Sequence, residues 1–256
     1  MPPFTYETYQ DVRKNLFYYS AITLNIAGFT AYRCVLPPSH QQWVSNWFEY
    51  LSQDPIIGGL FKVGVGVAIF TGLAFVLIEF LKIHDHTYDK YVVRWRFRYD
   101  IDFILQRLLK PFAARVGRKF YADAERNLND FMERLYYPYV GDRDGMIGKN
   151  AILRFYERIT IYWLTQVNEI IIGLLVVLIA AYRFLGPPDD HYRSHLLTVL
   201  LASVLTFVAN RVWMYFAREG AREATAEEID QITDNHQGDL EQRLRALCAD
   251  YQVPFS

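Results

Sequence analysis

The chain is poor in the residues on which metal sites and disulfide frameworks depend. Its 256 residues include only two cysteines and six histidines. Cys34 and Cys248 fall in segments that we place on opposite sides of a membrane, so they cannot form a disulfide, and no metal-binding spacing joins them. The chain also lacks a glycine-rich phosphate loop, a nucleophile elbow and a cysteine–histidine nucleophile arrangement. We therefore expect no resident cofactor, and an enzyme is the weaker hypothesis.

A dominant charge is also absent, because the formal net charge is only −1 at pH 7. Hydrophobic residues make up 52% of the chain, and they occur in long blocks that alternate with blocks of charged residues. Such blocks are typical of a protein that alternates between membrane and aqueous segments. The charge balance itself gives no indication of nucleic-acid binding.

The longest apolar run extends over residues 56–83 and predicts a transmembrane helix. Only Lys62 near its start and Glu79 near its end interrupt it. The run exceeds the roughly 20 residues needed to cross a hydrocarbon core. Gly64, Ala68 and Gly72 recur every four residues and share one helix face, which would let another helix approach closely. The expected neighbour is a helix of the same chain, with a subunit contact as the alternative.

Three further segments complete a predicted set of four membrane spans. Residues 1–36 hold an N-terminal segment and the first span, residues 56–83 the second, and residues 159–216 a hairpin of the third and fourth. Residues 37–55 carry tryptophans on one apolar face and predict a helix lying on the outer membrane surface. A helix lying in the interface is the alternative for residues 16–36. The fold class is thus an all-α integral membrane protein with a small cytoplasmic helical domain.

The charged blocks set the predicted orientation. Residues 84–168 hold 15 Lys and Arg against 11 Asp and Glu. The positive-inside rule places this stretch in the cytoplasm, and four spans then place both termini there. We expect a multi-pass location in a bacterial inner membrane, with the lipid bilayer as a partner.

The cytoplasmic segment, residues 84–158, opens with a pattern that fits two structures. Residues 93–103 alternate strictly between apolar and polar side chains, as a half-buried strand does. The same residues place Arg96 and Arg98 four positions before Asp100 and Asp102, as helical ion pairs do. We favour a helix that continues to Lys110, and a strand is the alternative. A second helix is predicted over residues 120–136.

The tail, residues 217–256, is acidic, with nine Asp and Glu against four Arg. Thr225 and Glu228 have the spacing of a capping box, which predicts a helix start. Apolar residues follow at helical spacing, with a break expected around residues 234–238. This helix should pack on the basic cytoplasmic segment or on a copy of it in another subunit.

Charged residues inside the spans form two predicted groups. Glu79, Glu169 and Arg211 should lie near the cytoplasmic ends of three spans and form an ion-pair cluster. Arg33, Lys62 and Arg183 should lie near the outer ends. Their long side chains either reach the lipid headgroups or line a pore mouth.

Two weaker patterns suggest ligand sites. A basic and aromatic group is a candidate for binding an anion such as a nucleotide, because arginine forks grip phosphates and aromatic rings stack on bases. Its members are Arg94, Trp95, Arg96, Arg98, Arg115, Arg118 and Lys119. The simpler interpretation is topology-setting charge that also docks the acidic tail. His84, His86 and Asp89 are weak metal candidates, since a helix would place the two histidines on different faces.

The layout of the chain resembles that of small multi-span membrane effectors of bacterial antiviral defence systems. The resemblance rests on the GGLFKVGVGVAIFTG span, the HDHTYDKYVVRWRFRYDIDF exit segment and the closing hairpin. The small-residue helix face, the charges at both ends of the spans and the oppositely charged cytoplasmic parts lead us to expect a homo-oligomeric channel or pore, gated from the cytoplasmic side by a ligand or a partner protein. The resemblance implies a role in antiviral defence, in which a protein partner or a messenger signals infection. A non-conducting scaffold that recruits a soluble partner is the alternative, and a membrane-bound metalloenzyme is the weaker third.

Overall fold

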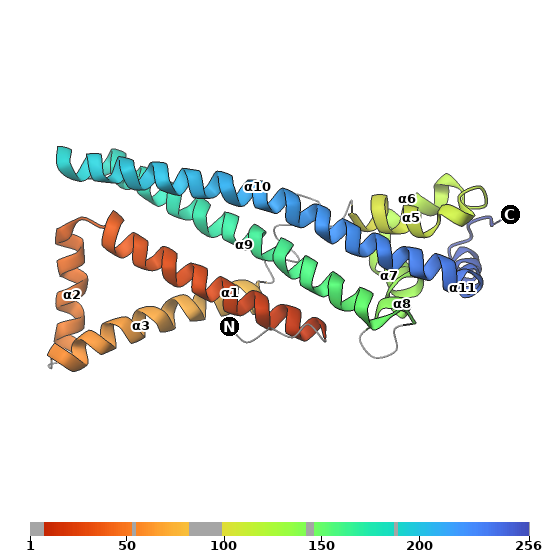
Figure 1. Ribbon diagram of the computed structural model, residues 1–256, viewed down its shortest axis with the longest axis horizontal. Coiled ribbons are helices and arrows are strands. Elements are labelled where there is room, and N and C mark those ends of the chain that lie inside the picture. Colours follow the sequence, from red (N-terminus) through yellow and green to blue (C-terminus); the bar gives the residue numbers. More distant parts are fainter. Residues whose placement is uncertain (1–7, 53–54, 82–98, 142–145, 187–188, 256) are drawn as a thin grey trace. The chain divides into compact units, whose positions relative to one another are not determined.

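The computed structural model describes residues 8–52, 55–81, 99–141, 146–186 and 189–255, without the side chains of residues 48–63. In these ranges the chain forms helices and one isolated antiparallel bridge between Val116 and Phe255 (Figure 1). The prediction of an all-helical fold is therefore confirmed for the described residues. The chain divides into two compact units. Unit 1 contains residues 1–12, 85–161 and 217–256, and unit 2 contains residues 13–84 and 162–216.

The helices occur in the following order. The first half of the chain holds α1 (Tyr9–Thr30), the π-helical turn η1 (Ala31–Val35), α2 (Pro38–Ser52), α3 (Pro55–Phe75) and η2 (Val76–Phe80). The middle holds η4 (Tyr99–Leu105), α5 (Gln106–Leu108), η5 (Lys110–Phe112), α6 (Arg118–Arg126), α7 (Leu128–Leu135) and α8 (Tyr137–Val140). The last part holds α9 (Lys149–Leu185), α10 (Asp190–Asn235) and α11 (Gln237–Asp250).

Two of the described helices, α9 and α10, are long and apolar enough to cross a membrane. Four spans were predicted. Of the second predicted span, only Gly64–Phe80 is fully described, and this apolar helix is shorter than a membrane-crossing helix needs to be. The first predicted span corresponds to α1 and η1, where polar side chains such as Asn15, Ser20 and Asn25 lower the hydropathy. Length and composition thus support membrane-crossing helices in the closing hairpin.

In unit 2, α1 packs antiparallel to α3. The ring of Phe17 meets that of Phe75 edge-on, with 6.4 Å between centroids. Farther along α1, the side-chain amide of Asn25 donates to the Thr71 hydroxyl at 3.4 Å. Gly28 lets the helices approach, because a Cβ atom there would overlap the Phe70 ring. The partners fall in the reverse order along the two helices, which fixes the antiparallel direction.

The other half of unit 2 is the helical hairpin of α9 and α10. Asn210 donates its side-chain amide to the carbonyl of Thr165 at 2.8 Å, which joins the helices near one end. Near the other end, Val35 packs with Ile179 and Leu196 in a buried apolar cluster. The Tyr192 hydroxyl also donates to the carbonyl of Val35. The turn η1, which follows α1, therefore packs against the hairpin.

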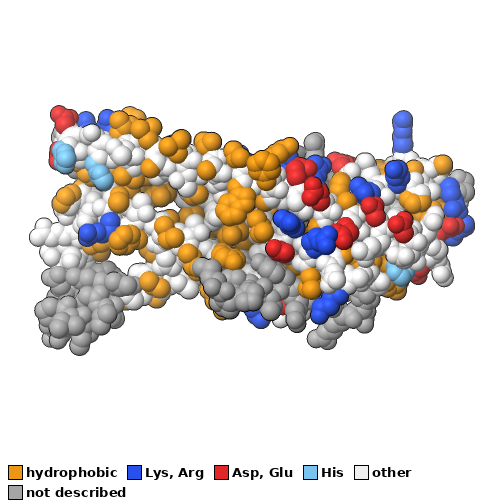
Figure 2. All heavy atoms as spheres, viewed as in Figure 1, with side chains coloured by type: hydrophobic (Ala, Val, Ile, Leu, Met, Phe, Trp, Pro, Cys, Tyr) orange, Lys and Arg blue, Asp and Glu red, His pale blue; other side chains and the backbone are white. Residues whose placement is uncertain are grey.

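Unit 1 has its own aromatic core. Phe120 meets Phe131 with 4.9 Å between ring centroids, and Phe131 meets Tyr251 at the same separation. Apolar residues of the tail are buried in this unit too, namely Ile229, Ile232, Leu240, Leu244 and Leu247. Figure 2 shows charged side chains mainly over the elements of unit 1, whereas hydrophobic side chains cover the helices of unit 2.

Several local predictions need correction. Thr225 and Glu228 do not start a helix, because both lie inside α10, where the Thr225 hydroxyl donates to the carbonyl of Ala221. The helix predicted over residues 120–136 is divided at Asn127 into α6 and α7. Residues 99–105 are helical, so the strand alternative fails there, while residues 93–98 lie outside the described residues. The tail breaks at His236, within the range expected.

Candidate functional site

Glu169 of α9 and Arg211 of α10 form an ion pair inside the apolar hairpin. The guanidinium nitrogen Nε of Arg211 lies 3.0 Å from the Glu169 carboxylate. The Glu169 side chain is only 9% exposed, whereas that of Arg211 is 51% exposed. The two helices therefore hold a carboxylate in their interior, and its cation partner extends to the surface of unit 2.

The third member of the predicted cluster has a different partner. The Glu79 carboxylate, in η2, forms an ion pair with Arg13 at the start of α1. The structure thus brings Glu169 and Arg211 together, and it pairs Glu79 with Arg13 instead. Sequence reasoning missed Arg13 as the partner of Glu79.

The predicted outer group is not brought together by any contact of its described side chains. Arg33 lies exposed in η1, and Arg183 lies half-buried in the last turn of α9. The backbone of Lys62 belongs to α3, but its side chain is outside the description. The role of these residues at a pore mouth stays a prediction.

The small-residue face of α3 is open in unit 2. No described atom lies within 4 Å of the position that a Cβ atom would take at Gly64 or Gly72, and Ala68 is exposed. The expected packing partner within the chain is therefore absent from the described residues. The alternative, a contact with another subunit, stays open.

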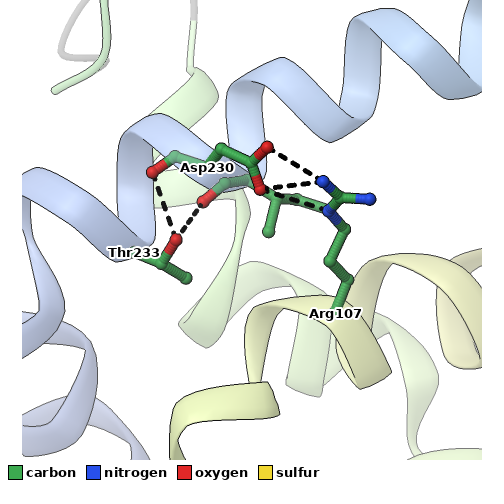
Figure 3. A network of polar contacts seen from close by, with 4 residues as sticks. Arg107, Asp230 and Thr233 are labelled. Carbon is green, nitrogen blue, oxygen red and sulfur yellow. Dashed lines mark hydrogen bonds and ion pairs between the residues drawn. The ribbon is translucent and has the colours of Figure 1, made fainter.

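In unit 1, the acidic tail is bound to the basic segment by ion pairs. Arg107 of α5 grips Asp230 of α10 through two nitrogens, with distances of 2.9–3.2 Å to the carboxylate oxygens (Figure 3). The neighbouring Thr233 donates its hydroxyl to the carbonyls of Ile229 and Asp230, which closes that turn of α10. The fork-like geometry of Arg107 fixes the register of α10 on α5.

Three more ion pairs join the two segments. They are Arg115 with Glu241 at 3.0 Å, Arg134 with Asp250 at 2.6 Å, and Arg154 with Glu227. The predicted docking of the tail thus takes place on the basic segment of the same chain. Charge blocks in the sequence indicated the docking, but long-range partners cannot be read from spacing, so Arg107, Arg134 and Arg154 were missed.

The docked tail also buries a carboxyl group. Glu228 is 0% exposed and accepts a hydrogen bond from the Tyr136 hydroxyl. Burial raises the pKa of Glu228 to about 8, because it disfavours the charged carboxylate more than the Tyr136 hydrogen bond favours it. Its second oxygen, Oε1, is buried without a hydrogen-bond partner. At neutral pH the group is therefore mostly protonated.

A second carboxyl group of the tail has the opposite behaviour. Asp239 accepts hydrogen bonds at 2.7 Å from both the Arg243 guanidinium and the Tyr139 hydroxyl. These bonds lower the pKa of Asp239, with Arg243 the larger cause. Asp239 is therefore ionised wherever the protein is folded near neutral pH, and it holds α11 against α8.

The predicted anion site is only partly described. Arg94, Trp95, Arg96 and Arg98 lie outside the described residues. Arg118 is exposed on α6, and Lys119 donates to the carbonyl of Gln252 at 3.0 Å. Arg115 contacts the tail and its guanidinium lies over the ring of Phe255, 4.3 Å from the centroid. Arg245 lies over the same ring at 5.0 Å, and sequence reasoning missed both Arg245 and Phe255.

The weak metal candidates cannot be placed, because His84, His86 and Asp89 all lie outside the described residues. Within the described ranges, no group of three or more histidine, cysteine, aspartate and glutamate side chains is arranged to hold a metal ion.

The family model of the YmfE protein family matches residues 41–246, which is most of the chain. The chain belongs to the YmfE protein family. No curated protein and no solved structure matches it. In this YmfE-family chain, the matched region contains the Glu169–Arg211 pair and the ion pairs of Asp230, Glu227 and Glu241.

Proposed function

We propose that the protein is a homo-oligomeric membrane channel or pore, gated from its cytoplasmic side. The observation that supports this most is the Glu169–Arg211 pair within the two helices able to span a membrane. Ionisable groups inside membrane helices are costly and commonly mark ion pathways. Arg211 is also half exposed between the exposed apolar residues Val208 and Val212. A guanidinium facing hydrocarbon would cost about 2.5–3.5 kcal/mol, so a water-filled passage or a second copy should cover it.

We propose that α1 and α3 also cross the membrane beside the hairpin, and the contact of η1 with the hairpin supports this. From the Val35–Ile179 contact, ten residues back along α1 lead to Asn25, and ten residues back along α9 lead to Glu169. At 1.5 Å per residue, both lie about 15 Å from that contact. We propose that the Asn25–Thr71 and Glu169–Arg211 contacts form one polar level of unit 2. A polar level contributed by four helices is what a multi-pass conducting path needs.

The docked tail supports gating. Residues of α10 take part in the hairpin of unit 2 and in the ion pairs of unit 1, so one continuous helix carries both sets of contacts. We propose that release of α11 from the basic segment favours the open channel. The resemblance to antiviral effectors adds the proposal that a partner or nucleotide produced during infection triggers this release at a bacterial inner membrane.

Ion flux from liposomes tests the channel. The full chain and a variant lacking residues 237–256 would be reconstituted and compared. We expect protein-dependent flux that rises when α11 is absent. Arg134→Asp should act in the same direction, because it breaks the pair with Asp250. Adding Asp250→Arg to it should restore low flux, which separates tail release from misfolding.

Flux that is absent in all four proteins, while the purified assemblies remain intact, would contradict the channel. The scaffold would then become the better proposal, because the charged surface of unit 1 suits a soluble protein partner (Figure 2). A stable monomer or dimer in detergent would point the same way. A membrane-bound metalloenzyme would instead require bound iron or zinc that is lost in His84→Ala and His86→Ala.

A further inference from the structure

One face of α10 carries an arginine at each end of its apolar segment. Arg193 and Arg211 lie 18 positions apart in this helix, which is about five turns and ~27 Å along the axis. After a whole number of turns, the two residues share one face. Their separation is close to the thickness of a hydrocarbon core, about 30 Å. Between Leu196 and Phe216, Arg211 is the only charged residue. This face is therefore basic at both ends of the proposed membrane span.

The side chains between the two arginines on this face are apolar and exposed. Leu197, Val204 and Val208 fall on it by helical spacing, and they are 45%, 40% and 52% exposed. An apolar helix face of this kind meets either lipid or other copies of the chain. The two arginines at its ends decide between these environments, because a guanidinium needs water or a polar partner.

Arg211 does not extend toward the headgroups nearest to it. The closer end of the apolar segment is Phe216, about 7.5 Å farther along α10. Side chains of an α-helix lean toward its N-terminus, so Arg211 leans the other way, toward the middle of the span. Its Nε lies 3.0 Å from the Glu169 carboxylate, which holds the guanidinium at this depth. Because the Arg211 side chain is still 51% exposed, water is needed on its open side.

At the opposite end of the span, Arg193 has an unsatisfied hydrogen-bond donor. Its side chain is half-buried in the first turns of α10, and its Nε is buried without a hydrogen-bond partner. A buried donor without an acceptor is costly, and a guanidinium is satisfied best by water or an anion. Both ends of the face therefore require a polar environment, although the segment between them is apolar.

We propose that this face of α10 lines a water-filled path between copies of the chain, and that Arg193 and Arg211 make the path selective for inorganic anions such as chloride. Rings of arginine side chains attract anions and repel cations. The Glu169 carboxylate does not cancel this preference, because it is only 9% exposed and a passing ion meets the guanidinium side of the pair. The inference rests on the proposed function, since it names the substrate class of that channel.

The reversal potential of the full-length protein in a planar bilayer, under a potassium chloride gradient, tests the selectivity. We expect chloride to permeate at least about tenfold better than potassium. Arg193→Glu should lower this ratio at least about tenfold. Glu169→Gln combined with Arg211→Gln should lower it too, and removing both charges leaves no lone buried carboxylate. Arg158→Gln, which removes an exposed arginine of α9, should leave the ratio unaltered. A current that favours potassium, or a ratio that survives both changes, would overturn the inference and leave the channel standing.

Cysteine modification in liposomes reads the water-filled path without ion flux. Val208→Cys places a thiol on the proposed face, and Leu205→Cys places one on another exposed face of α10. A negatively charged methanethiosulfonate should modify Val208→Cys at least about tenfold faster than Leu205→Cys, and faster than a positively charged one does. Equal rates at the two positions would overturn the path. Selective modification without any current would support the lined face and contradict the open channel, so the two failures are distinguishable.

Discussion

Among the residues of the tail, Glu228 differs most from an exposed side chain, because its buried carboxyl group keeps its proton. Its partner Tyr136 donates one hydrogen bond, yet burial has the larger effect on the pKa. A carboxyl that holds its proton at neutral pH docks the tail as a neutral group, whereas Asp230 and Asp250 dock it through charge. The stability of the docked tail therefore depends on pH in a way that the ion pairs alone would not produce.

Replacing Glu228 by Gln should flatten the pH dependence of the stability of unit 1. The native pKa of about 8 exceeds the ordinary value of 4.5, so the folded state retains a proton that the unfolded state has lost. The stability due to this group is complete below about pH 4.5 and is lost as the pH rises to about 8. Each pH unit in this interval corresponds to ~1.4 kcal/mol of folding stability. Thermal unfolding across this pH range measures the slope.

Glu227→Gln is the matched control, because Glu227 is adjacent in α10 but forms an exposed ion pair with Arg154. It should leave the slope almost as it is in the unchanged chain. A slope that persists in Glu228→Gln would mean that other groups produce the pH dependence.

Gln252→Gly should stabilise the C-terminal turn. The positive φ of Gln252 costs a residue with a Cβ atom about 1 kcal/mol, and glycine avoids that cost. Gln242→Gly, in the middle of α11, should instead destabilise by about 1 kcal/mol, because glycine weakens a helix interior. Chemical unfolding of the two variants should therefore shift in opposite directions. Shifts of the same sign would contradict the αL assignment of Gln252.

At the scale of elements, the pair between α9 and α10 should contribute strongly to the stability of unit 2. Arg211→Ala leaves the Glu169 carboxylate buried without its cation, which typically costs about 3–5 kcal/mol. Arg154→Ala removes an exposed pair of the same type and should cost at most ~1 kcal/mol. Melting of the purified proteins in detergent compares them. The idea fails if Arg211→Ala melts like the unchanged chain.

The close contact of α1 with α3 should make Gly28 sensitive to substitution. Gly28→Ala forces the Phe70 ring to move, and such overpacking commonly costs about 1–3 kcal/mol. Phe70→Leu in the same chain should recover part of the loss by vacating the space. Gly66→Ala is the control, since no described atom lies within 4 Å of its Cβ position. A lower melting temperature for Gly66→Ala than for Gly28→Ala would contradict this packing.

The elements also show what the sequence could and could not predict. The apolar segments of α9 and α10 are each long enough to predict a membrane-crossing helix, so the hairpin could be predicted from the sequence. The Thr225 and Glu228 spacing failed because a capping box needs a chain that enters the helix from outside. Here α10 is already helical, and Glu228 finds Tyr136, which lies 92 positions away in the chain. Partners at that distance follow from tertiary packing and leave no local pattern.

The same limit applies to the candidate sites. Opposite charge blocks predicted that the tail meets the basic segment, since net attraction depends on composition. The pairing of Glu79 with Arg13 depends on the register of α1 against α3, which Gly28 and Phe70 help to set. A one-residue error in that register would select another partner, so residue-level pairs were not predictable.

At the scale of the whole molecule, the open face of α3 provides a test of assembly. Gly72→Leu should leave the single chain folded, because nothing described approaches that position, but it should weaken a contact between copies. Gly66→Leu adds the same side chain to another face of α3 and serves as the control. The subunit number in detergent, measured by light scattering, should fall only for Gly72→Leu. An unchanged number in both would exclude this face as the subunit contact.

The buried position of Cys248 gives the molecule its own reporter. Cys248 is 2% exposed in α11, and burial raises the pKa of its thiol, so it should react slowly with alkylating reagents while α11 is docked. Cys34, the other free thiol, is half-buried in unit 2 and provides an internal reference. The ratio of modification rates at the two cysteines, read by mass spectrometry of the unmutated chain, therefore records the fraction of molecules whose tail is released.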